Sequence, residues 1–166
     1  MAKGLNSVAL ALLISAVLAG AGPAFAASKA NAKLLTFEAT TVSGLAYKSK
    51  ALLGAKPSVI WFWAPWCAIC RGEGPALASL SKKYQGKINF VGVGALGTQP
   101  QFQEFVAATK TDQITHLDDS SGQLWSRFGI VLQPSFVFIS KTGKLTKKVG
   151  PTSASYLSKA IAELAK

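Results

Sequence analysis

The two cysteines of this chain, Cys67 and Cys70, lie three positions apart and directly follow an apolar run. That run, Val59–Trp63, is apolar at every position, as expected of a strand buried on both faces. A helical pattern follows the cysteines, and two thiols at this spacing, the first at a helix start, can cycle between dithiol and disulfide. The stretch therefore predicts a strand–turn–helix unit that carries redox chemistry on thiols.

The N-terminus predicts a cleaved signal peptide. Lys3 supplies a short positive region, Val8–Leu18 is apolar except for Ser15, and Ala24–Ala26 forms a small-x-small cleavage pattern. A retained anchor is the alternative, which the shortness of the stretch disfavours. No cysteine follows the stretch, which excludes lipid attachment there. We expect residues 1–26 to be removed and residues 27–166 to form a single extracytoplasmic domain, secreted or held in the periplasm or cell envelope.

Residues 27–166 are strongly basic and long enough for one domain with a real core. They hold all but one of the 18 Lys and Arg residues and all 7 Asp and Glu residues, so the net charge falls from +11 to +10. They contain no further stretch able to span a membrane. Solubility explains scattered lysines; attraction to anionic envelope polymers or acidic clients is the alternative, resting on Lys141, Lys144, Lys147 and Lys148. We expect a monomer that does not bind nucleic acid.

A structural bridge and a zinc site are two other uses of the cysteine pair, and the sequence supports both less well than redox chemistry. A pair of cysteines in an exported protein normally indicates one structural bridge, but a bridge closing so short a loop constrains little of the unfolded chain. Zinc takes about four ligands, and the chain offers two cysteines and one histidine, His116. We therefore expect no metal and no cofactor.

Strand and helix patterns alternate along the chain. We expect a hairpin over 34–47, a strand over 58–63, a helix over 67–84, a strand over 88–93 and a helix over 101–109. A short segment over 114–117, a helical turn around 124–128, strands over 135–140 and 144–149, and a helix over 153–165, capped by Thr152 or Ser153, complete the chain. This order predicts an α/β sandwich with a mixed sheet.

Three motifs in this order resemble the thioredoxin superfamily. Residues 63–70, W-A-P-W-C-A-I-C, resemble its W-A-x-W-C-x-x-C signature, and Cys70–Pro75 is similar to the C-x-x-E-x-P continuation of the TlpA/ResA/DsbE branch. Gln133-Pro134 falls where that fold carries a cis-proline before a strand. The resemblance covers nearly all of residues 34–166 and is closest to secreted, soluble DsbE-like disulfide oxidoreductases of actinobacterial type. It implies a thioredoxin-like three-layer sandwich with a mixed central sheet and an N-terminal β-hairpin extension.

The helix start assigns different roles to the two cysteines. Unpaired N–H groups and the positive end of the helix dipole favour an anion at Cys67, so we expect Cys67 to be the exposed nucleophile. Cys70 would then be the buried resolving cysteine that breaks a mixed disulfide between Cys67 and a client.

Glu73 is the candidate proton acceptor for Cys70. It lies three residues after Cys70 on the same side of the helix, and its pKa would rise if burial dominates. The resemblance credits this glutamate with that role; the alternative is an exposed partner for Arg71 or a lysine. Ordinary thioredoxins place a buried aspartate on the preceding strand where this chain has Trp61, which gives Glu73 more weight.

Pro134 is the second predicted part of the site. If it is cis, the backbone of Gln133 would be free to pair with an extended client strand beside Cys67; the alternative is a trans proline that opens an edge strand. Trp66, with Pro65 beside it, is expected to border the client-binding surface. Trp61 and Trp63 are expected in the core, and the lone His116 is expected to be structural.

Three classes of function remain open. The leading one is a thiol:disulfide oxidoreductase that forms disulfides in exported cysteine-containing proteins and is recycled by an unidentified membrane or soluble redox partner. The second is a dedicated reductase, for example in cytochrome c maturation, and the third is a non-catalytic envelope binding protein. A peroxiredoxin-type peroxidase is disfavoured, because Ala64 lies where its T-x-x-C motif has threonine.

Overall fold

The computed structural model describes residue 1, residues 31–54 and residues 56–166. The signal peptide predicted for residues 1–26 lies, Met1 aside, outside the described residues. Within the described ranges, no helix is both long enough and apolar enough to cross a membrane.

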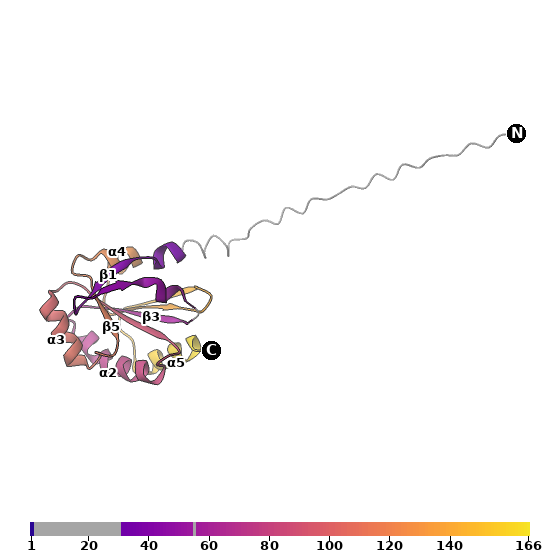
Figure 1. Ribbon diagram of the computed structural model, residues 1–166. Coiled ribbons are helices and arrows are strands. Elements are labelled where there is room, and N and C mark those ends of the chain that lie inside the picture. The colour runs from indigo at the N-terminus through magenta and orange to yellow at the C-terminus, as the bar shows by residue number, and fades with distance from the viewer. Residues whose placement is uncertain (2–30, 55) are drawn as a thin grey trace.

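A seven-stranded mixed sheet forms the middle layer of the domain (Figure 1). Its order is β2-β1-β5-β4-β3-β6-β7, in which β3, β4 and β5 are parallel, and β6 runs antiparallel to β3. The β1–β2 hairpin joins antiparallel to β5. The predicted mixed central sheet and N-terminal hairpin are therefore confirmed. The strands are β1 (Glu38–Thr41), β2 (Ala46–Lys48), β3 (Ser58–Trp63), β4 (Asn89–Gly94), β5 (Thr115–Asp118), β6 (Ser135–Ile139) and β7 (Leu145–Val149).

The hairpin is shorter than the alternation of residues predicted. Residues 31–35 are helical, and the first strand begins only at Glu38. Leu35 is buried among side chains on one face of the sheet, and Arg127 donates hydrogen bonds to the carbonyls of residues 33, 34 and 36. These long-range contacts hold the segment out of the sheet.

Helices cover both faces of the sheet (Figure 1). They are α2 (Ala68–Lys83), α3 (Gln99–Thr109), α4 (Gln123–Phe128) and α5 (Ala154–Leu164), with a 3₁₀ helix η1 (Ser49–Leu53). Side chains of β3 alternate between the two cores: Val59, Trp61 and Trp63 pack with residues of α2, α3 and α5, whereas Ile60 and Phe62 pack with residues of η1 and α4. This three-layer arrangement is the predicted thioredoxin-like sandwich.

Local capping fixes where the helices begin. Ser153 accepts a hydrogen bond from the Tyr156 N–H (3.1 Å) and is the N-cap of α5. Helix α3 starts two residues before its predicted position, because Thr98 and Gln101 form a capping box ahead of it. Cys67 is the N-cap of α2, one residue before the helix itself. Because α2 directly follows β3 in the chain, the cysteine pair lies at the carboxyl end of the parallel strands.

His116 belongs to the core beside β3. The Trp63 Nε1–H donates to its Nδ1 (3.2 Å), so the neutral ring donates from Nε2 to the Thr111 carbonyl (3.1 Å). Burial lowers the His116 pKa to about 4. The histidine is thus a neutral structural link between β5 and β3.

Candidate redox site at the start of helix α2

Cys67 and Cys70 form a disulfide across the first turn of α2. Their Cα atoms lie 5.3 Å apart, and the Cys70 N–H points at the Cys67 sulfur (3.1 Å). In the reduced protein, the same N–H and the helix N-terminus would stabilise a thiolate at Cys67. The geometry supports thiol–disulfide exchange with Cys67 as the ionised partner.

Cys67 is more covered than the sequence predicted. Cys67 is 6% exposed and Cys70 is fully buried, so neither cysteine is open to solvent. The neighbouring residues Trp66 (60%) and Ile69 (51%) are exposed instead. A reacting thiol would therefore approach Cys67 past these two exposed side chains, and Cys70 would stay inaccessible.

Trp66 is hydrogen-bonded to the loop after β4. Its Nε1–H donates to the Leu96 carbonyl (2.9 Å), and Leu96, in the loop after β4, is itself exposed. Gly97 in the same loop has no room for a side chain, because an added Cβ would lie 2.5 Å from Pro65. The loop after β4 and the segment before α2, which carries Pro65 and Trp66, together form an apolar rim beside the disulfide. Leu96 is a candidate rim residue that the sequence analysis missed, since no motif marks it.

The Gln133–Pro134 peptide bond is cis. Ser135, the next residue, pairs with Phe62 near the end of β3, which places Pro134 at the same end of the sheet as Cys67. Among the described residues, neither the N–H nor the C=O of Gln133 has a hydrogen-bond partner. Val131 and Leu132, just before it, are exposed apolar side chains.

Glu73 is buried inside the helix layer. It is 7% exposed, and its Oε1 accepts a hydrogen bond from the Thr152 N–H (2.9 Å) in the loop before α5. Burial raises the Glu73 pKa from 4.5 to about 7, although the Thr152 N–H, the Lys148 charge and the Trp61 indole each lower it. The alternative of an exposed ion-pair partner is therefore wrong for this residue.

Trp61 faces this carboxyl from β3. The Trp61 Nε1–H and Glu73 Oε2 are both buried, and neither has a hydrogen-bond partner among the described residues. The indole nevertheless lies close enough to lower the Glu73 pKa. Two unpaired polar atoms buried in one apolar layer are costly in free energy.

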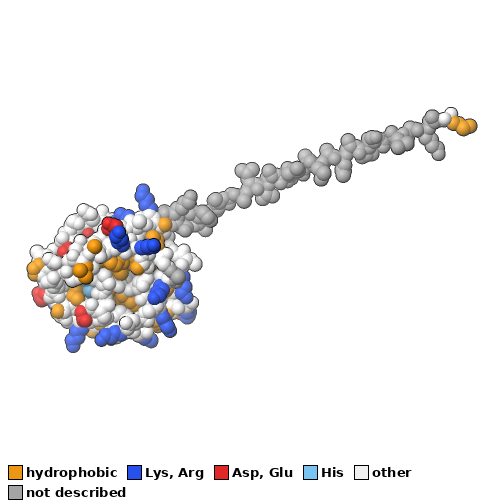
Figure 2. Space-filling model, viewed as in Figure 1, with side chains coloured by type: hydrophobic (Ala, Val, Ile, Leu, Met, Phe, Trp, Pro, Cys, Tyr) orange, Lys and Arg blue, Asp and Glu red, His pale blue; other side chains and the backbone are white. Residues whose placement is uncertain are grey.

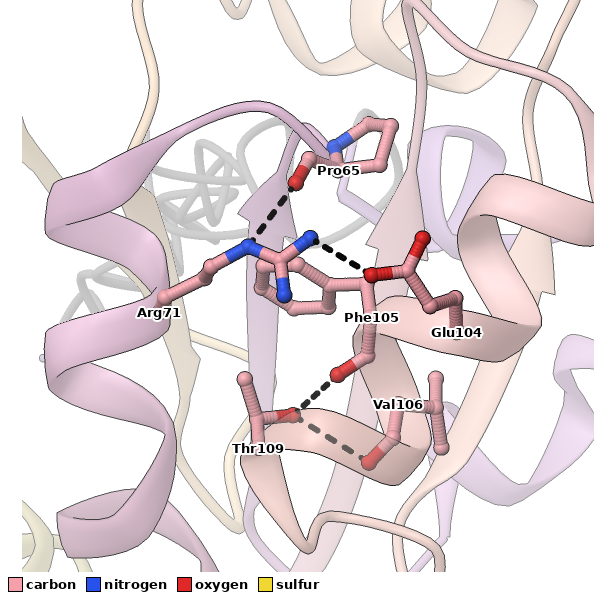
Figure 3. A network of polar contacts seen from close by, with 6 residues as sticks. All are labelled: Pro65, Arg71, Glu104, Phe105, Val106 and Thr109. Carbon is pink, nitrogen blue, oxygen red and sulfur yellow. Dashed lines mark hydrogen bonds and ion pairs between the residues drawn. The ribbon is translucent and has the colours of Figure 1, made fainter.

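Arg71 ties the start of α2 to α3 (Figure 3). Its Nε donates to the Pro65 carbonyl (3.2 Å), and its guanidinium reaches Glu104 (3.4 Å) while lying over the Phe105 ring (5.4 Å). The sequence analysis considered Arg71 only as a partner for Glu73. Arg71 therefore pairs with Glu104, 33 residues away, instead of Glu73.

No group of three or more metal-ligating side chains occurs in the described part of the chain. Asp118 and Asp119 instead bind backbone: the Asp119 carboxylate accepts from the N–H groups of Leu124 and Trp125, at the start of α4. Asp119 therefore caps the start of α4, and Asp118 accepts from the Ser120 N–H in the turn before it.

Known proteins are similar to this chain in sequence and in fold. Residues 30–148 match the AhpC/TSA family. The soluble secreted antigen MPT53 of Mycobacterium tuberculosis is 35% identical over 153 residues, which cover 92% of this chain and 84% of MPT53. A secreted Mycobacterium tuberculosis disulfide oxidoreductase homologous to E. coli DsbE is 34% identical with a TM-score of 0.75, covering 80% of this chain and 98% of that one. MTB DsbF, solved in mixed oxidised and reduced forms, gives the same identity and TM-score over 79% of this chain and 96% of its own. These matches confirm the predicted resemblance, and the chain belongs to the AhpC/TSA family with a thioredoxin-like fold.

Proposed function

We propose that this protein is an extracytoplasmic thiol:disulfide oxidoreductase that donates its Cys67–Cys70 disulfide to exported proteins. The observation that carries the proposal is the disulfide across the first turn of α2, with Cys67 as the N-cap. The secreted relatives and the leader-like residues 1–26 support the location.

The exchange runs in two steps. A client thiolate attacks the Cys67 sulfur, the Cys67–Cys70 bond breaks, and Cys70 leaves as a thiolate that takes up a proton. A second client thiolate then attacks the client sulfur of the mixed disulfide, and Cys67 leaves as a thiolate at the helix start. The client gains a disulfide, and the two electrons remain on the Cys67–Cys70 dithiol. An oxidising redox partner must remove these electrons before the next cycle.

Glu73 serves as the proton reservoir for Cys70. Both side chains belong to the buried face of α2, three residues apart. A carboxyl with a pKa of about 7 can both give and take a proton near neutral pH. The proton released or taken up by Cys70 would thus stay inside the helix layer.

The client would lie along the segment before β6. The unpaired backbone groups of Gln133 offer hydrogen bonds to an extended chain, and Trp66 with Pro65 borders the path to Cys67. We expect cysteine-containing exported proteins as clients, bound through backbone and apolar contacts.

A trapping experiment tests the roles of the two cysteines. Cys70→Ala should accumulate mixed disulfides with clients on Cys67, because the resolving thiol is gone, and Cys67→Ala should accumulate none. Non-reducing gels of the exporting host reveal such adducts. Equal trapping by both variants would overturn the assignment. Equilibration of the intact protein with glutathione decides the direction of electron flow. A reduction potential of about −120 mV indicates an oxidant, and one of about −270 mV indicates a reductase.

A further inference from the structure

Seven exposed lysines occupy the end of the molecule opposite Cys67. We call this set the basic end; its members are Lys56, Lys82, Lys83, Lys87, Lys141, Lys144 and Lys166. In Figure 2 the blue side chains gather around the end at which the C-terminus lies, whereas most red ones lie in the other half.

The strand directions place four of these lysines. Cys67 follows the carboxyl end of β3, so Lys56, two residues before β3, lies at the other end. Lys87 precedes β4, which is parallel to β3 and paired with it from Ser58 and Asn89 onward. The turn between β6 and β7, which carries Lys141 and Lys144, lies at this end too, because Ile139 pairs with both Ser58 and Leu145.

The helices place the remaining three lysines. Helix α2 begins beside Cys67, and its 16 residues carry Lys82 and Lys83 to its far end, about 24 Å away. Lys166 follows the end of α5, and its carbonyl accepts a hydrogen bond from Lys141 Nζ (3.1 Å). The seven charges therefore come from separate segments that meet at one end of the domain.

Few acidic groups balance this charge in the described part of the chain. Glu163 lies at the basic end and pairs with Lys166 (2.7 Å), and Asp112, in the loop before β5, follows Lys110 closely in sequence. At the redox end, by contrast, Arg71 is paired with Glu104, and β5 ends in an acidic residue. The charge of the protein is thus polarised along the direction of α2.

A groove opens among the lysines of the basic end. Its volume is about 500 Å³, and its walls include the apolar parts of Phe138, Tyr156 and Leu164. Lys141, Lys144 and Lys166 line it as well, together with one carboxylate, Glu163, which is paired with Lys166. Cations around an apolar groove match an amphiphile that has an anionic head. A water-soluble polyanion would satisfy the lysines but leave the apolar walls uncovered.

The chain also enters the domain at this end. Asn31 Nδ2 donates to the Gly143 carbonyl (3.0 Å) in the turn between β6 and β7. The described part of the domain therefore begins beside the turn that carries Lys141 and Lys144.

We propose that the basic end binds the surface of a bilayer containing anionic phospholipids, with a headgroup held over the groove. Each lysine near such a surface contributes to the attraction, and the contributions of several lysines add up. In this orientation the C-terminal end of α2 faces the bilayer, and its N-terminal end, which carries Cys67, faces away from the bilayer and toward the clients. The inference concerns a surface separate from the disulfide and does not depend on the direction of electron flow.

Vesicle binding of the exported, leader-free protein tests the proposal. We expect binding to phosphatidylglycerol–phosphatidylcholine vesicles in sedimentation assays, no binding to phosphatidylcholine alone, and loss of binding as salt rises. Lys87→Gln/Lys144→Gln removes two charges whose side chains make no hydrogen bond or ion pair with the described residues, and it should weaken binding on the order of 30-fold. The control, Lys48→Gln, removes one exposed charge outside the basic end, where Lys48 makes only an exposed ion pair with Glu38 (3.4 Å), and it should change binding less than about threefold.

Three outcomes would overturn the proposal. They are absence of binding to the anionic vesicles at low salt, a loss in Lys48→Gln as large as that in Lys87→Gln/Lys144→Gln, and binding of inorganic polyphosphate as tight as that of vesicles. The orientation has its own readout: vesicle-bound, reduced protein should react with a soluble maleimide as fast as free protein. Protection of its thiols by vesicles would contradict the assigned face, while disulfide exchange measured without vesicles reports on the redox site alone.

Discussion

The buried carboxyl of Glu73 makes the stability of the oxidised protein depend on pH. Its pKa is about 7 in the folded protein against 4.5 for an ordinary glutamate. Because ionisation is harder in the folded state, the unfolded chain ionises first, and stability is lost as pH rises from about 4.5 through 7. A rise of this size corresponds to about 3 kcal/mol, which solvent screening at a partly solvated carboxyl reduces to about 2 kcal/mol.

Glu73→Gln removes this dependence, because glutamine stays neutral and its amide oxygen can still accept the Thr152 N–H. We expect the variant to match the wild type near pH 4 and to be more stable by about 2 kcal/mol near pH 8. Urea unfolding of the oxidised proteins, followed by tryptophan fluorescence across that range, gives the difference directly. Glu104→Gln is the control, since Glu104 is exposed and its ion pair with Arg71 is long. A difference between Glu73→Gln and wild type that does not change with pH would refute the reasoning.

Other expected outcomes follow from single contacts. Ultraviolet titration of the reduced protein should give Cys67 a pKa at least about one unit below the ordinary value of about 8.5; an unshifted titration would remove the argument from the helix start. Gly92→Ala should cost about 2–3 kcal/mol in denaturant unfolding, because its Cβ would lie 2.1 Å from His116 Nδ1; wild-type stability would show that the core can yield there. Trp66→Ala should slow exchange with a client peptide about tenfold at nearly unchanged melting temperature, and unchanged rates would separate Trp66 from client binding.

Local patterns predicted the fold well, because they depend on neighbours in the chain. The apolar run of β3 and the periodicity of α2 each reflect contacts that residue type and spacing already determine. The resemblance added the position of Pro134 at the start of β6. The one clear error in the sheet, Leu35, came from a segment whose conformation depends on Arg127, 92 positions further along the chain.

Features of the site that depend on distant contacts could not be predicted in the same way. The coverage of Cys67 depends on loops that meet only in the folded chain. The partner of Glu73, the Thr152 N–H, lies 79 residues away, and Arg71 binds Glu104 across two helices. The lysines of the basic end look scattered in sequence, because they come from segments that only the topology brings together.

The relation between Trp61 and Glu73 explains why the carboxyl belongs on the helix in this chain. The resembling thioredoxins carry an aspartate at the Trp61 position, whereas here the indole fills that part of the core and only its Nε1–H is polar. This N–H and that of Thr152 favour ionised Glu73, and burial opposes it more strongly. The balance leaves the pKa near 7, where a group exchanges protons with least cost at neutral pH. A carboxyl with a full ion-pair partner would stay ionised, and one without donors would stay protonated, so neither would suit the proton exchange with Cys70 that we propose.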